Sequence, residues 1–239
     1  MENAVFLGNG LKKLNINPSS KIIKDLLIYK DMLLDWNKKI NLTSITDEKE
    51  IFIKHFFDSA TCISTGYIKN SSKIIDVGTG AGFPGLVLKI LNNEINITLL
   101  DSLKKRTVYL EDLVSKLDLK KVEIIHGRAE EYAKKNGYRE EYDIVLSRAV
   151  ASLNVLLEYC IPYVKVGGFF LCQKGPNYET ELKQAEKALN ILGGKVEEIM
   201  EFHLPYSDIT HYIIIIKKVF ITPTKYPRKP GKPSSNPIK

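Results

Sequence analysis

A glycine-rich segment between an expected strand and an expected helix constrains the fold of this chain most strongly. The segment runs from Asp76 to Gly85, reads DVGTGAGFPG, and has four glycines in its last eight residues. Glycine permits a sharp backbone turn and lets a ligand approach without a Cβ atom in the way. The start of the following helix adds free N–H groups and a positive dipole end. The segment therefore predicts a nucleotide-like ligand at a strand–helix turn.

Two acidic residues narrow the class of this ligand. The spacing of Gly80, Gly82 and Gly85 matches the dinucleotide-binding fingerprint, which is weak evidence on its own. The carboxylate of Asp76 would repel a pyrophosphate but suits an ammonium group, directly or through the loop backbone. Asp101 ends the next expected strand and can accept both hydroxyl groups of a ribose. An amino acid joined to a nucleoside suits both carboxylates, so the residues predict S-adenosylmethionine as cofactor.

Strand and helix patterns alternate along the chain from residue 73 onward. Such alternation predicts a mostly parallel sheet with helices on both faces, which is an α/β, Rossmann-like domain over residues 71–220. Ligands of such sheets bind at the carboxyl ends of the strands. Seven strands are expected at residues 73–77, 95–100, 122–125, 142–146, 168–172, 196–202 and 211–218, and helices at 84–91, 104–117, 153–163 and 179–192.

The first 70 residues are predicted to form a helical extension. The segment Pro18–Ser20 is a helix start signal, and apolar residues then recur at helical spacing from Ile22 to Trp36. Asp47 with Glu50 resembles a capping box, with Asp in place of Ser or Thr. We expect the helix that follows this box to reach about residue 64.

The last nineteen residues form a basic tail. The net charge of the chain is +7, and the tail contributes five positive charges and no acid. A basic arm gains affinity for phosphate backbones by releasing counterions, although a solubilising tail is equally consistent with the charge. The prolines of residues 221–239 predict an extended, semi-stiff arm rather than a helix. The basic residues of the tail are Lys225, Arg228, Lys229, Lys232 and Lys239.

Composition argues against several classes of protein. The longest aliphatic run, Ile213–Ile216, is far too short to span a bilayer, and the N-terminus lacks the features of a secretory signal. The three cysteines are well separated and show no metal-binding spacing. We therefore expect a cytoplasmic protein that binds neither a membrane nor a metal, with its cysteines as small buried hydrophobic residues.

The sequence shows none of the residues that some methyl-transfer reactions require. After the fourth strand, Ser147-Arg148 stands where amino-group methylation uses an Asn/Asp-Pro-Pro-Tyr/Phe turn. Cys160 and Cys172 lie inside an expected helix and strand and do not suit a nucleophile. A ring nitrogen with a free lone pair, such as guanine N7, needs alignment and desolvation more than a base. The absence of an obvious catalytic base in the sequence therefore fits a ring nitrogen as the methyl acceptor.

Several short motifs carry a family resemblance. The chain resembles the bacterial small-subunit ribosomal RNA guanine-N7 methyltransferases, also called the glucose-inhibited division protein B family. The pieces Asn41-Leu42-Thr43 and His55-Phe56-Phe57-Asp58-Ser59 are more specific than the glycine loop. The full set spans nearly the whole chain and comprises residues 36–43, 54–59, 76–85, 100–106, 127–130, 147–151 and 174–175, together with the Pro-rich basic end.

The resemblance implies a class I methyltransferase fold, in which the last or last-but-one strand is antiparallel, with S-adenosylmethionine as cofactor. It implies that the family's reaction, methylation of one guanine N7 in a conserved loop of 16S ribosomal RNA, takes place here. Asp76, Gly80 and Asp101 then belong to the cofactor site. The other residues that it places at the cofactor are Gly78, Phe83, Ala129, Glu130 and Arg148.

The resemblance also places residues at the mouth where RNA enters. Asn41, His55 and Asp58 lie there, and we assign Asn41 and His55, with Arg148, to the catalytic group. The basic run Lys104-Lys105-Arg106 opens a helix, where positive charge is unfavourable against the dipole, so we expect it to meet RNA phosphates. The other residues assigned to RNA are Arg128, Lys174, Arg228 and Lys229. We expect a monomer that acts on 16S ribosomal RNA or the small ribosomal subunit.

Several alternatives stay open on the sequence alone. The glycine loop also suits a nicotinamide-dependent oxidoreductase, although Asp76 argues against it. The protein could methylate a different RNA base, or be a non-catalytic ribosome-assembly factor. Glu130 with Glu131 is also consistent with an exposed acidic helix start, and His55 with a partly buried structural histidine.

Overall fold

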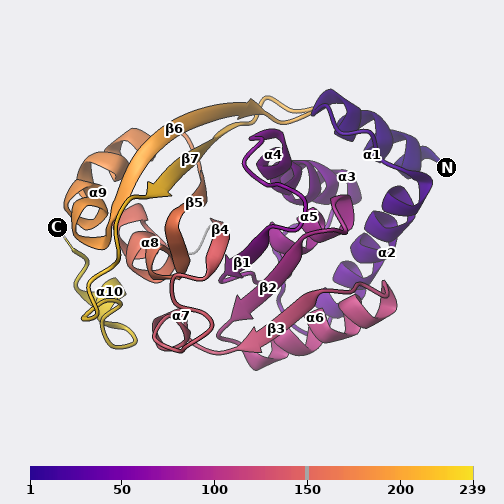
Figure 1. The fold of residues 1–239 in the computed structure, drawn as a ribbon. Helices are drawn as coiled ribbons and strands as arrows, with labels where there is room; N and C mark the ends of the chain where they lie inside the picture. The colour runs from indigo at the N-terminus through magenta and orange to yellow at the C-terminus, as the bar shows by residue number, and fades with distance from the viewer. Residues whose placement is uncertain (149–150, 239) are drawn as a thin grey trace.

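The expected strands form one seven-stranded sheet in the computed structural model, which describes residues 1–148 and 151–238 (Figure 1). The strands are β1 (Lys73–Val77), β2 (Asn96–Asp101), β3 (Val122–His126), β4 (Tyr142–Arg148), β5 (Val164–Lys174), β6 (Gly194–His203) and β7 (Thr210–Lys218). The helices on the sheet are α5 (Gly85–Leu91), α6 (Lys104–Lys116), α7 (Ala129–Tyr132), α8 (Leu153–Cys160) and α9 (Tyr178–Leu192), and α8 continues as a 3-10 turn, Ile161–Tyr163.

The strand order is β3-β2-β1-β4-β5-β7-β6. β1 to β5 pair in parallel, whereas β7 is antiparallel to both β5 and β6. The predicted Rossmann-like α/β fold with an antiparallel last strand is therefore confirmed. Because the strand order reverses between β1 and β4, the carboxyl ends of these two strands border the crevice where such sheets bind ligands.

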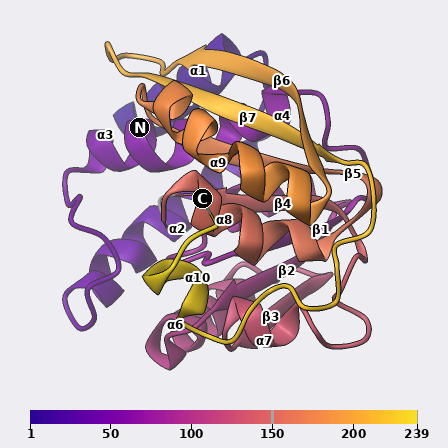
Figure 2. The ribbon, with the colours of Figure 1, turned by 90° about the vertical axis from the view of Figure 1, so that its left-hand side faces the viewer.

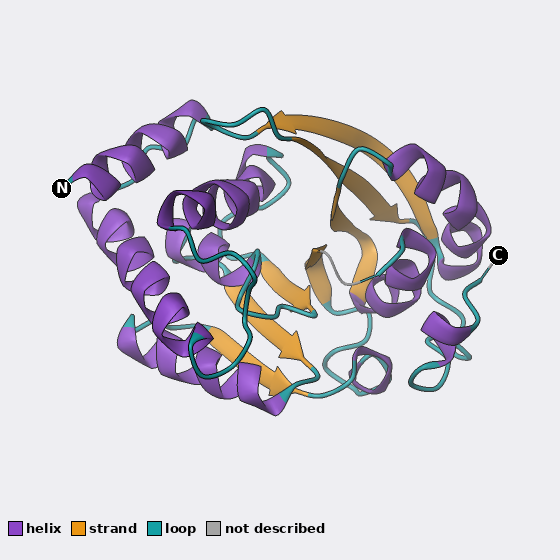
Figure 3. Cartoon of the chain, turned by 180° about the vertical axis from the view of Figure 1, so that it is seen from behind, coloured by secondary structure: helices purple, strands orange, loops and turns teal. Residues whose placement is uncertain are grey.

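The aliphatic run in β7 is explained by its place inside the sheet. Ile213–Ile216 are all buried, and alternate members of the run face opposite sides. One side belongs to a core shared with the N-terminal helices, and the other to a core shared with α8 and α9. A strand covered on both faces carries a continuous apolar run, whether or not it is parallel to its neighbours. Figure 3 shows helices on both sides of the sheet.

The predicted helical extension packs against the α5 and α6 side of the sheet. It consists of α1 (Glu2–Lys13), α2 (Ser20–Asn37) and a helix from residue 48 to residue 64. Ser19 caps α2, as its sequence predicts, by accepting a hydrogen bond from the Ile22 amide. The hydroxyl of Tyr29 on α2 donates to the Ala81 carbonyl at 2.6 Å, which ties the extension to the glycine loop.

The helix after the capping box is continuous but changes its hydrogen-bonding pattern. It comprises α3 (Glu48–Ile51), a π-helical segment (Phe52–Phe57) and α4 (Asp58–Ser64). The Asp47 carboxylate accepts from the Glu50 amide at 2.9 Å, so the predicted cap is confirmed. The π-helical segment was not predicted. Such segments occur frequently at functional sites, and this one carries His55.

The basic tail differs from its prediction. It contains a short helix, α10 (Lys232–Ser235), and it packs against α8 instead of extending away (Figure 2). Pro233 and Ile238 are buried, and Ile238 belongs to the core on the α8 and α9 side of the sheet. The prediction of a non-helical arm is therefore wrong for residues 232–235. Lys239 lies outside the described residues.

No helix of the described residues is long and apolar enough to cross a membrane.

Candidate active site

A cavity of about 520 Å³ lies at the carboxyl ends of the central parallel strands. The glycine loop lines it, together with the ends of β2 and β4, the start of α7 and the loop segment Leu42–Thr43. Tyr159 of α8 and Ser234 of α10 also line the cavity. The volume is within the range of small-molecule sites in proteins, about 300–1,000 Å³.

The glycine loop exposes its backbone to this cavity. Gly80 has a φ of +62°, and no atom lies within 4 Å of the place that a Cβ would take. At Gly82, with a φ of +99°, a Cβ would stand 2.5 Å from the Tyr29 hydroxyl. Gly78 and Phe83 also line the cavity, as predicted. The open backbone and the acidic rim fit S-adenosylmethionine.

Asp76 acts on the site through the loop and not by direct contact. Its side chain is fully buried and is absent from the lining of the cavity. One oxygen, Oδ2, accepts from the Thr79 hydroxyl at 2.7 Å and from the Gly85 amide at 2.8 Å. The other oxygen has no hydrogen-bond partner among the described residues. Of the two roles predicted for Asp76, the structure supports the one through the loop backbone.

Asp101 lies at the rim of the cavity and is 3% exposed. Its carboxylate accepts from the Gly80 and Leu103 amides, both at 2.9 Å, and pairs with Arg106 at 3.4 Å. A carboxylate offers about four acceptor positions, so it retains one for a ribose hydroxyl, where the sequence predicted that it accepts both hydroxyls. Three bonds from its own chain fix the orientation of this acceptor before any ligand arrives.

Glu130 is buried at the start of α7 and lines the cavity beside Ala129. Its Oε1 atom accepts from the Gly231 amide of the tail at 3.0 Å. The alternative of an exposed acidic helix start is therefore wrong for Glu130, although it holds for the exposed Glu131. Arg128, directly before α7, lies at the edge of the same cavity.

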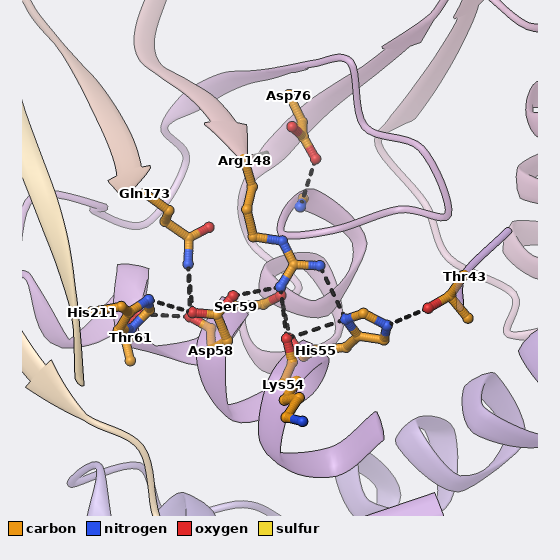
Figure 4. Close-up of polar contacts among 11 residues, drawn as sticks. Thr43, Lys54, His55, Asp58, Ser59, Thr61, Asp76, Arg148, Gln173 and His211 are labelled. Carbon is orange, nitrogen blue, oxygen red and sulfur yellow. Dashed lines mark hydrogen bonds and ion pairs between the residues drawn. The ribbon is translucent and has the colours of Figure 1, made fainter. Parts of the chain in front are cut away.

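The guanidinium group of Arg148 lines the cavity. Figure 4 shows the polar contacts that hold it. The guanidinium donates to the Asp58 carboxylate at 2.5 Å and to the Lys54 carbonyl at 3.0 Å. A second nitrogen lies 3.3 Å from Nδ1 of His55. The guanidinium also lies over the ring of Phe83, 5.1 Å from its centroid. These contacts fix Arg148 in one position at the end of β4.

Asp58 joins Arg148 to two further residues, Gln173 and His211, that were not among the predicted site residues. Oδ1 lies 2.5 Å from Nδ1 of His211, and the Gln173 amide donates to the Asp58 backbone carbonyl at 2.9 Å. Burial alone would raise the pKa of Asp58, but the contacts with His211 and Arg148 outweigh it and lower this pKa. Asp58 is therefore an ionised, buried anchor.

His211 escaped the sequence analysis because it begins an antiparallel strand. The start of β7 lies at the same edge of the sheet as the end of β5, where Gln173 lies. The rule that ligands sit at carboxyl ends of parallel strands selects Gln173 and omits His211.

His55 is a neutral side chain packed between polar and aromatic partners. Nε2 lies 2.8 Å from the Thr43 hydroxyl, and the ring stacks on Phe83 with centroids 4.5 Å apart. Burial lowers the pKa of His55 to about 4, with a smaller contribution from Arg148. Nδ1 faces two groups of opposite character, the Lys54 carbonyl at 3.1 Å, which only accepts, and the Arg148 guanidinium at 3.3 Å, which only donates.

A second cavity, of about 470 Å³, adjoins the first. His55 and Arg148 line both, so these two side chains form the boundary between them. Leu204 and Ile209 give the second cavity an apolar wall, and Asp58, Gln173 and His211 give it a polar one.

Asn41 is not brought to either cavity. Asn41 is exposed, whereas its neighbours Leu42 and Thr43 line the first cavity. The loop takes this course because the Asn37 side chain accepts from the amides of both neighbours, at 2.8 Å and 3.0 Å. The geometry therefore gives no support to the catalytic role predicted for Asn41, and it assigns the shaping of the loop to Asn37.

Two of the predicted RNA-binding cations are already engaged inside the protein. The side chain of Lys174 is 9% exposed and donates at 2.8 Å to both the Ala151 carbonyl and Glu181. Arg228 forms an ion pair with the buried Glu158. Lys174 nevertheless lines a cavity together with His55 and Arg148, near the predicted mouth of the site, and RNA binding by Lys174 and Arg228 stays a prediction. The sequence reveals the charges of these residues but not their buried partners.

Of the other predicted cations, Lys104, Lys105, Arg128 and Lys229 are exposed. Lys104 and Lys105 are at the start of α6, where the run was expected to open a helix, and Lys229 is exposed in the tail. Arg106 turns inward to Asp101 and lines the first cavity. Two residues of the motif after β4, Ala149 and Val150, lie outside the described residues. Within the described part of the chain, no group of three or more His, Cys, Asp or Glu side chains is arranged to hold a metal.

We expect Asp76→Asn to change the pH dependence of stability. Burial, the largest cause, raises the pKa of Asp76 from 3.8 to about 7. The stability that this group contributes is complete below its unfolded pKa and is lost as the pH rises through the folded one. Asn cannot ionise, so the variant does not lose this stability. The difference between its unfolding free energy and that of the natural chain should therefore shift in favour of the variant by about 1–3 kcal/mol as the pH rises from about 4.5 to about 7.5.

Urea unfolding at a series of pH values measures this difference. The exposed Asp31, changed to Asn, is the matched control and should show no comparable trend. A constant offset between Asp76→Asn and the natural chain across this range would contradict the assignment of a buried, protonated carboxyl group.

Comparison with known proteins identifies the family. A family model described as GidB, rRNA small subunit methyltransferase G, matches residues 22–210. A protein named ribosomal RNA small subunit methyltransferase G from Alkaliphilus oremlandii is 55% identical over 100% of both chains. The proteins of the same name from Acetivibrio thermocellus and Clostridium botulinum are 52% and 46% identical, covering 96% and 100% of this chain and 94% and 100% of their own.

Solved structures support the fold. TrmN from Thermus thermophilus aligns with a TM-score of 0.53 at 13% identity, covering 67% of this chain and 48% of that one. TYW2 from M. jannaschii, solved in complex with AdoMet, aligns with a TM-score of 0.52 at 13% identity, covering 68% and 77%. With the glycine loop, Asp101 and the family match on one chain, the protein belongs to the rRNA small subunit methyltransferase G family and is an S-adenosylmethionine-dependent rRNA methyltransferase.

Proposed function

We propose that this protein transfers a methyl group from S-adenosylmethionine to N7 of one guanine in the 16S ribosomal RNA of the small subunit. The observation that carries the proposal is the meeting of two cavities at Arg148 and His55. The first suits the cofactor. The second, at about 470 Å³, is large enough for a purine base, and its apolar wall favours a flat, partly apolar group.

The chemistry of the boundary favours an acceptor that loses no proton. His55 has a pKa near 4 and holds its Nδ1 atom against Arg148, whose guanidinium cannot serve as a base. Asp58 is committed to Arg148 and His211. These side chains position the reactants and exclude water from them. A methyl transfer that needs no proton removal depends mainly on such alignment.

Guanine N7 matches such a boundary. The bound cofactor supplies a methyl group on a positively charged sulfur. The lone pair of N7 forms the new nitrogen–carbon bond as the carbon–sulfur bond breaks, and the positive charge passes to the base without release of a proton.

The surface around the first cavity suits an RNA backbone. Lys104 and Lys105 are exposed at the start of α6, Arg128 lines the cavity edge, and phosphate contacts by such residues release counterions. We infer that the protein acts in the cytoplasm, on 16S ribosomal RNA or on the small subunit.

A methyl-transfer assay tests the proposal directly. The protein is incubated with labelled S-adenosylmethionine and with naked 16S RNA or small subunits from cells that lack the enzyme. We expect label in the RNA, recovered as 7-methylguanosine after nuclease digestion. The variant Arg148→Gln should transfer at least about tenfold less, because the boundary loses its fixed guanidinium. Label on another base would overturn the N7 assignment, and no label on either substrate would overturn the RNA assignment.

The role of the basic start of α6 is tested separately by charge reversal. We expect Lys104→Glu with Lys105→Glu to weaken RNA binding and to lower the slope of log K against log salt by about 1 for each phosphate that the protein no longer neutralises. The matched control reverses Lys183 and Lys187, two lysines of α9. Filter binding over a salt series measures both, and equal slopes for the two double variants would refute a role of α6.

A further inference from the structure

The end of the chain returns to the cofactor cavity. We define the C-terminal strap as residues 226–238, which include α10. Figure 2 shows α10 beside α8, with the chain end continuing along that helix. Thr222, four residues before the strap begins, already attaches the chain to the sheet domain. Its hydroxyl donates to the Leu192 carbonyl and accepts from Lys218, both at 2.7 Å. The strap is therefore held at its start, and its buried residues Pro227, Pro233 and Ile238 fix it at further points.

A buried ion pair fastens the strap to α8. Glu158 is fully buried, and Arg228 supplies three donors to its carboxylate: the backbone amide at 2.7 Å, Nε at 2.9 Å and Nη2 at 2.6 Å. All the hydrogen bonds of this carboxylate within the described residues come from Arg228. A buried charge that loses its only partner is strongly destabilising, so strap and carboxylate depend on each other.

Beyond this pair, the strap contributes to the cofactor cavity in two ways. The Gly231 amide donates to Glu130, which is buried and lines the cavity. Ser234 of α10 lines the same cavity, as does Tyr159, the residue that follows Glu158 on α8. The strap therefore holds one wall residue in place and supplies another.

We propose that the C-terminal strap completes the cofactor site and that Glu158 and Arg228 are positioning residues for S-adenosylmethionine. They act through Gly231, Glu130 and Ser234 and do not touch the cofactor. This role concerns cofactor binding alone, so it is independent of which RNA base accepts the methyl group. It also gives Arg228 a function that needs no RNA.

Linkage gives the proposal a quantitative form. If the docked strap raises the affinity for the cofactor by some factor, the bound cofactor stabilises the docked strap by the same factor. The two effects are measured by different experiments, one on the ligand and one on the strap.

The first experiment measures binding of S-adenosylhomocysteine by calorimetry, without RNA. We expect Arg228→Gln to raise Kd about tenfold or more, since the strap loses its charged bonds to Glu158. Lys229→Gln is the matched control, because it removes the same charge from the exposed neighbouring position and should change Kd less than about twofold. An unchanged Kd for folded Arg228→Gln would overturn the proposal.

A second variant tests the proposal even if Arg228→Gln does not fold. A chain that ends at Pro230 keeps the pair between Arg228 and Glu158 but lacks Gly231 and α10. The buried Glu158 keeps its charged partner, so this variant should fold, with a circular dichroism spectrum that differs from the natural one only by the loss of the four-residue helix α10. We expect its Kd for S-adenosylhomocysteine to rise about tenfold. Natural affinity in this shortened chain would overturn the proposal.

The second experiment follows hydrogen exchange of residues 226–238 in the full-length protein, with and without S-adenosylhomocysteine. We expect the ligand to slow exchange of these amides in the natural chain, and the effect to be lost in Arg228→Gln. A merely structural strap would exchange at the same rate in both conditions, and that result would overturn the proposal.

Discussion

The buried carboxylate of Asp58 is the contact on which the arrangement of the site depends. It joins Arg148 at the end of β4, His211 at the start of β7 and the junction of the π-helical segment with α4. A charge buried here without its partner would be strongly unfavourable, so the three parts of the fold are held to one geometry. His55 and Phe83 then pack against the fixed guanidinium, and the boundary between the two cavities follows from that packing.

Features that depend on neighbours in sequence were predictable. The glycine loop, its strand and its helix appear where the pattern put them, because a sharp turn after a buried strand needs glycine wherever the strand lies. Asp101 lies at the cavity because the end of a parallel strand is a fixed place in this fold. The direct and indirect roles of Asp76 could not be separated by sequence, since the difference is whether its side chain faces the cavity or the loop backbone.

Features that depend on partners far along the chain were not predictable. Lys174 and Arg228 carry the charge expected of RNA-binding residues, but within the protein they form ion pairs with Glu181 and the buried Glu158. The importance of His211 rests on antiparallel pairing of β7, which brings its first residues to the catalytic edge of the sheet. Asn41 illustrates the reverse case, because a motif residue can mark a functional loop while its neighbours reach the cavity.

The central claim is that Arg148 and His55 divide a cofactor cavity from an acceptor cavity. A crystal structure of the protein with sinefungin, whose amine replaces the transferable methyl group, tests it most directly. We predict that the nucleoside lies along the glycine loop with its ribose at Asp101, and that the amine points past Arg148 and His55 into the cavity lined by Leu204, Ile209 and His211. An amine directed away from that cavity, or a nucleoside bound elsewhere, would contradict the account.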